Sequence, residues 1–362
     1  MSAGLRLAAD FCQSVVRPLL DEAFPGLDYA AALLGPGSEV LGYDTRRSTD
    51  HDWGPRLQVL LADGAEPEPV LAVLAERLPA TFRGYPVAFP RTGDPDVRHR
   101  VVVSELGAWL TGQLGFDPRR GVALADWLTT PTQRLAEFTT GAVFHDGPGE
   151  LTAARSALAW YPQDVWLYVL ACQWHRIAQE EAFPGRCAEV GDALGSAVVA
   201  ARLVRDVMRL WLLMHRHYPP YSKWLGTAFA QVSGTGPLAA TLTAAVSAAE
   251  WPAREQHLCA AYTLAAEEHN RLGLTAPLDP TARSFYDRPY QVLAADRFAT
   301  ALTESITDPA VKRLPPTGAV DQFTDSTDAL NDLPRLRAGA GNPALPRCSN
   351  LLVIRLHDGY AG

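Results

Sequence analysis

The first 147 residues combine apolar spacings of two kinds, those typical of helices and those typical of strands. Residues 3–22 have amphipathic helical spacing, and the apolar run 30–34 and the alternating residues 57–61 are typical of strands. Residues 68–78 place their apolar side chains on one helical face, and 99–106 are rich in β-branched residues. We also expect a short strand at 85–89 and a polar loop at 92–98. This alternation predicts an α/β unit.

After a Gly-Pro-Gly break at 147–149, the pattern becomes helical and Pro or Gly residues separate the segments. The predicted helices are 150–160, 164–182, 187–217, 222–232, 237–251 and 254–272, with one more at 291–306. We therefore predict an α+β fold with three parts. These are a core with a mixed sheet (1–147), an α-helical bundle (148–274), and a helix and loop-rich extension packed on the bundle (275–362).

Composition narrows the functional classes. The 362 residues are 48% hydrophobic and 20% charged, as in globular proteins, and the net charge of −8 disfavours a nucleic-acid partner. Five scattered cysteines indicate neither a disulfide framework nor a zinc site. Arg6, Asp10 and Arg17 interrupt the N-terminal segment, which argues against a signal peptide, and no apolar run has the length of a membrane span. The expected location is the cytoplasm, with no membrane partner.

The stretch 33–61 holds the best candidate site. Gly37 allows close backbone approach to a ligand, and Ser38, a helix N-cap candidate, offers a hydroxyl and an N–H group to a phosphate. In an extended backbone, Asp50 and Asp52 would point to the same side at the start of a strand. Paired carboxylates suit Mg²⁺, which takes one or two of them together with substrate phosphates. The alternative for Asp50 and Asp52 is a solvated turn, since the segment STDHD is also good turn chemistry.

Gly37-Ser38 followed by Asp50-x-Asp52 resembles the signature of the nucleotidyltransferase superfamily, which includes DNA polymerase β-like and kanamycin nucleotidyltransferase-like enzymes. Three stretches, GSEVLGYDTRRSTDHDWGPR, LAWYPQDVWLYVLACQWHRIAQEEAF and YPPYSKWLGTAF, also resemble a largely uncharacterised bacterial family with this core. The resemblance implies a nucleotidyltransferase-like core with a helical half that closes over the nucleotide. It also implies a Mg²⁺-dependent transfer of a nucleoside monophosphate from an NTP to an acceptor hydroxyl. His51 departs from the superfamily pattern, which usually has an apolar residue at that position.

Further candidates are cations for the triphosphate and a third carboxylate. Lys223 follows the Tyr218–Tyr221 turn and is a candidate nucleotide-binding residue. Arg202, Arg205 and Arg209 share a helical face and are weaker candidates, since a solvated face explains them equally well. Our first choice for the third carboxylate is Glu105, and the others are Glu137, Glu150, Glu180 and Glu181. Trp160, Tyr161 and Trp166 are explained more simply by core packing than by base stacking.

Three functional hypotheses remain open. The first is a nucleotidyltransferase acting on an acceptor that we expect to be a small molecule. The second is a nucleotide-binding regulator with the same fold and no turnover, favoured by the missing third carboxylate and by His51. The third is a toxin–antitoxin-type module, based on the Arg209 and His215 spacing found in some helical ribonucleases. The sequence leaves a homodimer open.

Overall fold

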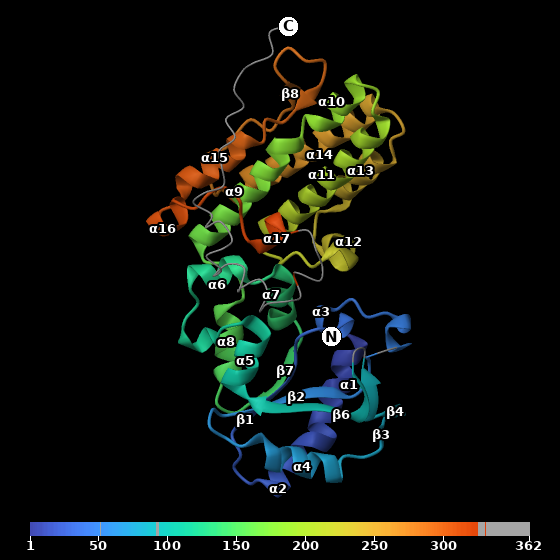
Figure 1. Ribbon diagram of the computed structural model, residues 1–362, viewed down its shortest axis with the longest axis vertical. Helices are drawn as coiled ribbons and strands as arrows, with labels where there is room; N and C mark the ends of the chain where they lie inside the picture. The colour runs from blue at the N-terminus through green and yellow to red at the C-terminus, as the bar shows by residue number, and fades with distance from the viewer. Residues whose placement is uncertain (51, 92–93, 325–329, 331–362) are drawn as a thin grey trace, which may run out of the picture.

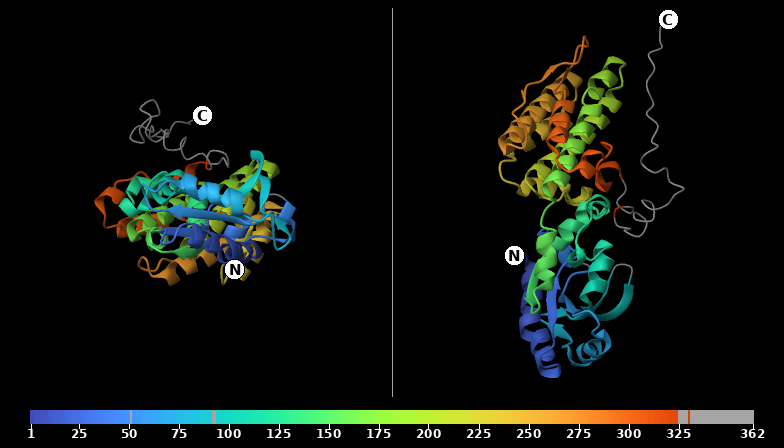
Figure 2. Two further views of the ribbon diagram at one scale, coloured as in Figure 1. Left: turned by 90° about the horizontal axis from the view of Figure 1, so that it is seen from below. Right: turned by 90° about the vertical axis from the view of Figure 1, so that its left-hand side faces the viewer.

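The computed structural model describes residues 1–50, 52–91, 94–324 and 330. Their chain forms an elongated molecule, with a sheet-containing part at one end and a helical bundle at the other (Figures 1 and 2). The fold is mixed, with a mixed sheet and many helices, as predicted. No helix among the described residues is long and apolar enough to cross a membrane.

The strands of the main sheet are β1 (Tyr29–Leu33), β2 (Arg56–Leu61), β5 (Ala88–Arg91), β6 (Asp94–Glu105) and β7 (Ala142–Asp146). Their spatial order is β5-β6-β2-β1-β7. The β2–β6 pair is parallel, with Arg56 opposite Arg100 and Leu61 opposite Glu105. The other three pairs, β1–β2, β1–β7 and β5–β6, are antiparallel. The minor strands are β3 (Thr81–Phe82) paired with β4 (Tyr85–Pro86), and β8 (Arg283–Ser284) paired with β9 (Gln291–Val292).

Helices cover both faces of the sheet. The helices up to residue 146 are α1 (Ala3–Phe11), α2 (Arg17–Ala23), α3 (Ser38–Leu41), α4 (Pro67–Arg77), α5 (Leu106–Leu114), α6 (Leu124–Thr129) and α7 (Thr132–Thr139). A π-helical turn, Cys12–Val16, joins α1 to α2. Successive strand residues point to opposite faces. Leu57 and Val59 therefore share a core with Phe11 and Leu74 of the first helices, whereas Leu60 packs with α5.

The second half is helical. Its helices are α8 (Glu150–Ala157), α9 (Gln163–Glu180), α10 (Phe183–Glu189), α11 (Ala193–Met214), α12 (Ser222–Gln231), α13 (Gly236–Ser247), α14 (Trp251–Leu272), α15 (Asp296–Ser305), α16 (Pro309–Lys312) and α17 (Val320–Phe323). One hydrophobic cluster includes Leu60 in the sheet, Leu135 in α7 and Leu210 in α11. The apolar core is therefore continuous from the sheet into the bundle.

Four predicted elements are wrong in detail. The single strand expected at 85–89 is two strands, β4 and β5, which belong to different sheets. The single helix expected at 187–217 is two helices, because the chain turns at Gly191, which has a φ of +76°. Much of the polar loop expected at 92–98 belongs to β6, which begins at Asp94 and pairs there with Arg91. The helix expected from residue 291 begins at Asp296, because Gln291 and Val292 form β9.

Candidate functional site

A cavity of about 320 Å³ lies where the amino-terminal end of β2 faces α7 and α12. Four segments contribute to it: the loop after β1 with the start of α3, the segment before β2, α7, and the start of α12. Its lining residues are Pro36, Gly37, Ser38, Glu39, Leu41, Ser48, Asp52, Trp53, Arg56, Gln133, Glu137, Tyr221, Lys223 and Trp224. Gly37, Ser38, Asp52 and Lys223, all selected from the sequence, therefore line one cavity.

The loop between β1 and α3 brings backbone close to charged side chains. Gly37 has a φ of +155°, and a Cβ atom there would lie 2.6 Å from Nη2 of Arg56. This positive φ favours glycine, and a side chain here would displace the guanidinium group of Arg56. Ser38 is the first residue of the short helix α3, whose N-cap is Gly37. The expectation that Ser38 itself is the N-cap is therefore wrong.

A buried ion pair between Arg56 and Glu39 stabilises this loop. Nη2 of Arg56 donates hydrogen bonds to Oε1 of Glu39 and to the carbonyl oxygen of Pro36. The side chains of Arg56 and Glu39 are 10% and 5% exposed, so water screens their charges weakly. The pair ties the loop that follows β1 to the start of β2.

The backbone around the two aspartates differs from the extended strand that the sequence suggested. Asp50 is the last residue of a 3₁₀ turn, Arg46–Asp50, and Asp52 has a left-handed φ of +53°. The prediction that strand alternation aligns the two carboxylates is therefore wrong. Asp52 lines the cavity, whereas His51 and the side chain of Asp50 lie outside the described residues.

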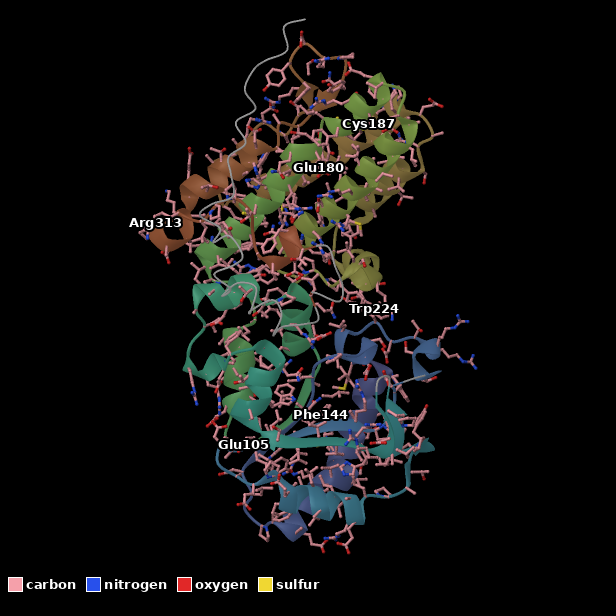
Figure 3. All side chains as sticks on the ribbon, in the orientation of Figure 1. Glu105, Phe144, Glu180, Cys187, Trp224 and Arg313 are labelled. Carbon is pink, nitrogen blue, oxygen red and sulfur yellow. The ribbon has the colours of Figure 1, made fainter. Side chains whose placement is uncertain are left out.

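The α12 region forms the opposite wall. Nζ of Lys223 lies 4.7 Å from the centre of the Trp224 ring, as a cation–π contact. The Trp224 ring in turn lies 5.3 Å from that of Tyr43, which follows α3. Trp224 points from α12 toward the sheet-containing part in Figure 3. Only two of the chain's 32 cationic Lys and Arg residues are lysines, Lys223 and Lys312. Lys223 is therefore one of two lysines in the chain, and it lines the cavity.

Glu105, our first choice for the third carboxylate, is in the wrong place. It ends β6 opposite Leu61, so about five residues, roughly 16 Å along the strand, separate it from the end where Asp52 lies. Figure 3 shows Glu105 and Trp224 well separated. Glu105 accepts a hydrogen bond from the Gly64 N–H. Among the other candidates, Glu150 pairs with Arg119 and Glu180 pairs with Arg202.

Glu137 is the candidate carboxylate that lines the cavity. It is 5% exposed, and burial raises the pKa of its carboxyl group. Two hydrogen bonds oppose this shift: Nε2 of Gln133 donates to Oε1 at 2.8 Å, and Nη1 of Arg134 donates to Oε2 at 3.3 Å. Glu137 can therefore exchange a proton closer to neutral pH than an exposed glutamate can.

The cations proposed on α11 do not line this cavity. Arg202 pairs with Glu180 at 3.0 Å, and Nη1 of Arg209 donates to the carbonyl oxygen of Asp321 at 2.6 Å. Arg205 sits between them on the same helix, also away from the cavity lining. These positions favour structural roles within the bundle.

Two other groups of residues considered in the sequence analysis, the Arg209–His215 spacing and the aromatic group, have structural partners outside the cavity. His215 pairs with Glu268 at 3.1 Å, while Arg209 faces Asp321, so the two residues of the ribonuclease-like spacing have separate partners. Trp160, Tyr161 and Trp166 pack with one another and with Tyr218. Core packing therefore explains the aromatic group, as expected.

Several lining residues escaped the sequence analysis. Trp53 and Arg56 lie within the stretch 33–61, and their neighbourhood to Asp52 could have suggested them. Glu39 lies in the same stretch, next to Ser38, whereas Gln133 had no comparable indication, because an isolated Gln on a helix is usually a surface residue. Their importance depends on tertiary burial, since Gln133 and Glu39 are only 3% and 4% exposed.

Comparison with known families gives one match. Residues 127–225 are similar to a family described as "Domain of unknown function (DUF4037)". This segment includes α7 with Glu137 and the beginning of α12 with Lys223. No curated protein gives a significant match to the chain.

Proposed function

We propose that this protein is a Mg²⁺-dependent nucleotidyltransferase. It would transfer a nucleoside monophosphate from an NTP to the hydroxyl group of an acceptor, for which we favour a small molecule. The observation that carries this proposal is the shared cavity, which joins Gly37 and Ser38 to Asp52 and to Lys223, 171 residues further along the chain. The proposed core is nucleotidyltransferase-like, in keeping with the sequence resemblance.

The donor set is compatible with Mg²⁺ bound together with its nucleotide. No group of three His, Cys, Asp or Glu residues among the described positions could hold a metal ion by itself. Mg²⁺ needs only one or two carboxylates when substrate phosphates complete its shell. Asp50 and Asp52 would hold the ion, which would neutralise phosphate charge and orient the triphosphate.

The remaining residues, on the two walls of the cavity, would bind the triphosphate and take the proton from the acceptor. Backbone N–H groups and the hydroxyl of the Gly37–Ser38 loop would contact the β- and γ-phosphates, and Lys223 would add a positive charge. The acceptor oxygen attacks the α-phosphorus as the bond to the bridging α–β oxygen breaks, and pyrophosphate leaves. Glu137 would take the hydroxyl proton. Trp53 and Trp224 offer aromatic faces to a base.

The test is transfer of α-labelled NTP to a panel of small-molecule acceptors. We expect Asp50→Asn and Asp52→Asn to abolish labelling and pyrophosphate release. Glu105→Gln is the matched control, because it removes a carboxylate at the other end of the sheet and should leave activity intact. Failure of the wild-type protein to bind Mg–NTP in calorimetry would refute the proposal. Binding without pyrophosphate release for any acceptor would instead support the nucleotide-binding regulator.

A further inference from the structure

The first turn of α7 holds the chain segment that carries Lys223. Oγ1 of Thr132 donates to the carbonyl oxygen of Pro219 at 2.6 Å, and Oε1 of Gln133 accepts the Tyr221 N–H at 3.1 Å. Pro219 and the proline after it each fix their own φ, which stiffens the turn. The position of Lys223 is therefore set by α7 as well as by its own helix.

The NH₂ group of the same Gln133 amide binds the carboxylate of Glu137. Nε2 of Gln133 donates to Oε1 of Glu137 at 2.8 Å, one helical turn further along α7. Both side chains are buried. An amide suits this position because its carbonyl accepts from the Tyr221 N–H while its NH₂ group donates to the carboxylate.

A third segment fixes the start of α7. The Thr132 N–H donates to Oδ2 of Asp321 at 2.8 Å, and Nη1 of Arg209 donates to the carbonyl oxygen of Asp321 at 2.6 Å. Asp321 belongs to α17, 189 residues after Thr132. These contacts hold the first turn of α7, and with it Gln133, against the bundle.

We propose that Gln133 is a positioning residue that couples the turn carrying Lys223 to the carboxylate of Glu137. This inference rests on the proposed function, because it assumes that Lys223 contacts the nucleotide and that Glu137 takes the acceptor proton. A single buried amide sets both positions, so nucleotide binding and proton transfer share one structural support.

Glu137 has other charged and titratable neighbours. Arg134 bonds it from α7 itself, and Tyr221, whose pKa is raised by burial and by the charge of Glu137, faces it from the α12 side. Lys223, Asp52 and the Glu39–Arg56 pair line the rest of the cavity. Removing the Gln133 side-chain amide takes away one bond to the ionised carboxylate, while Arg134, Asp52 and the Glu39–Arg56 pair keep their own contacts. The pKa of Glu137 should then rise.

The experiment compares Gln133→Leu, Thr132→Val and Glu137→Gln with wild type. Calorimetry measures Mg–ATP affinity, and NMR of ¹³C-glutamate-labelled protein measures the pKa of the Glu137 carboxyl group, with Glu137→Gln assigning the resonance. We expect Gln133→Leu to weaken affinity roughly three- to tenfold, the effect of one neutral hydrogen bond. It should also raise the pKa of Glu137 by roughly one unit, because it removes a bond to a charged group.

Thr132→Val separates the two effects, since it loosens the Pro219 contact without touching Glu137. It should weaken affinity and leave the pKa of Glu137 unmoved. Gln133→Met also removes both hydrogen bonds of the amide without adding a charge, so it should act as Gln133→Leu does, and it serves if Gln133→Leu does not fold.

Either of two results would overturn the coupling: wild-type affinity in Gln133→Leu, or an unmoved Glu137 pKa in both Gln133 variants. Neither readout needs turnover. Absence of pyrophosphate release from the wild type would therefore count against the proposed function, while the coupling would still be decided by affinity and by the pKa of Glu137.

Discussion

The Glu39–Arg56 ion pair gives a stability prediction that is independent of the chemistry at the cavity. Both side chains are at most 10% exposed, so removing one partner leaves the other charge buried. Breaking a buried pair in this way costs about 3–5 kcal/mol. We therefore expect Glu39→Gln and Arg56→Leu each to lower the free energy of unfolding by that amount. The double variant should lose less than the sum of the two, by about 1–3 kcal/mol, because the second substitution removes the stranded charge.

Urea denaturation followed by tryptophan fluorescence measures these differences from the transition midpoint and slope. The matched control is the Arg77–Glu22 pair, an Arg–Glu pair with an N–O distance of 2.7 Å and side chains that are 35% and 68% exposed. Glu22→Gln should cost about 0–1 kcal/mol. If Glu39→Gln and Arg56→Leu cost no more than this control, or if their effects simply add, the pair does not support the loop as described.

Three further predictions concern separate features. Lys223→Ala should weaken Mg–ATP binding about 10- to 150-fold through loss of one charge-assisted contact, whereas the same calorimetry should show no change for Lys312→Ala. Burial raises the pKa of Glu181 from 4.5 to about 7, so its stabilising contribution is full below about pH 4.5 and is lost as the pH rises through 7; Glu181→Gln should reduce the stability difference between pH 4.5 and 8 by about 3 kcal/mol in urea titrations. Gly141→Ala should destabilise far more than Gly26→Ala in thermal unfolding, because both glycines have positive φ but only a Cβ at Gly141 would meet backbone, the Leu33 carbonyl oxygen at 2.4 Å.

Local patterns predicted the strands and helices better than the site. The apolar alternation at 57–61 corresponds to β2, and the β-branched run at 99–106 corresponds to the end of β6. Such residues favour a half-buried strand whichever strand it pairs with, so the local pattern was enough to predict them. Pairing direction and register were not predictable in the same way. The parallel β2–β6 register is what separates Glu105 from Asp52, and no local spacing encodes it.

The site shows the same limit more strongly. Gly37, Ser38 and Asp52 lie within one short stretch, so local chemistry was enough to select them. Glu137 was one candidate among several, because its burial results from packing between α7 and the α12 region. Gln133 was not identified at all, because its role depends on a hydrogen bond to the backbone of Tyr221, which is 88 residues away.

Continuity of the core argues against closure of the helical half as a rigid body over the nucleotide. One hydrophobic cluster contains Leu60 of the sheet, Leu135 of α7, and Tyr218 and Leu225 on the α12 side. Hinge motion between the walls of the cavity would expose part of this cluster at about 25 cal/mol per Å² of apolar surface. The walls are therefore preassembled, and adjustment to a ligand falls to exposed side chains. Lys223 is the best placed of these, because leaving the Trp224 ring costs only a surface cation–π contact.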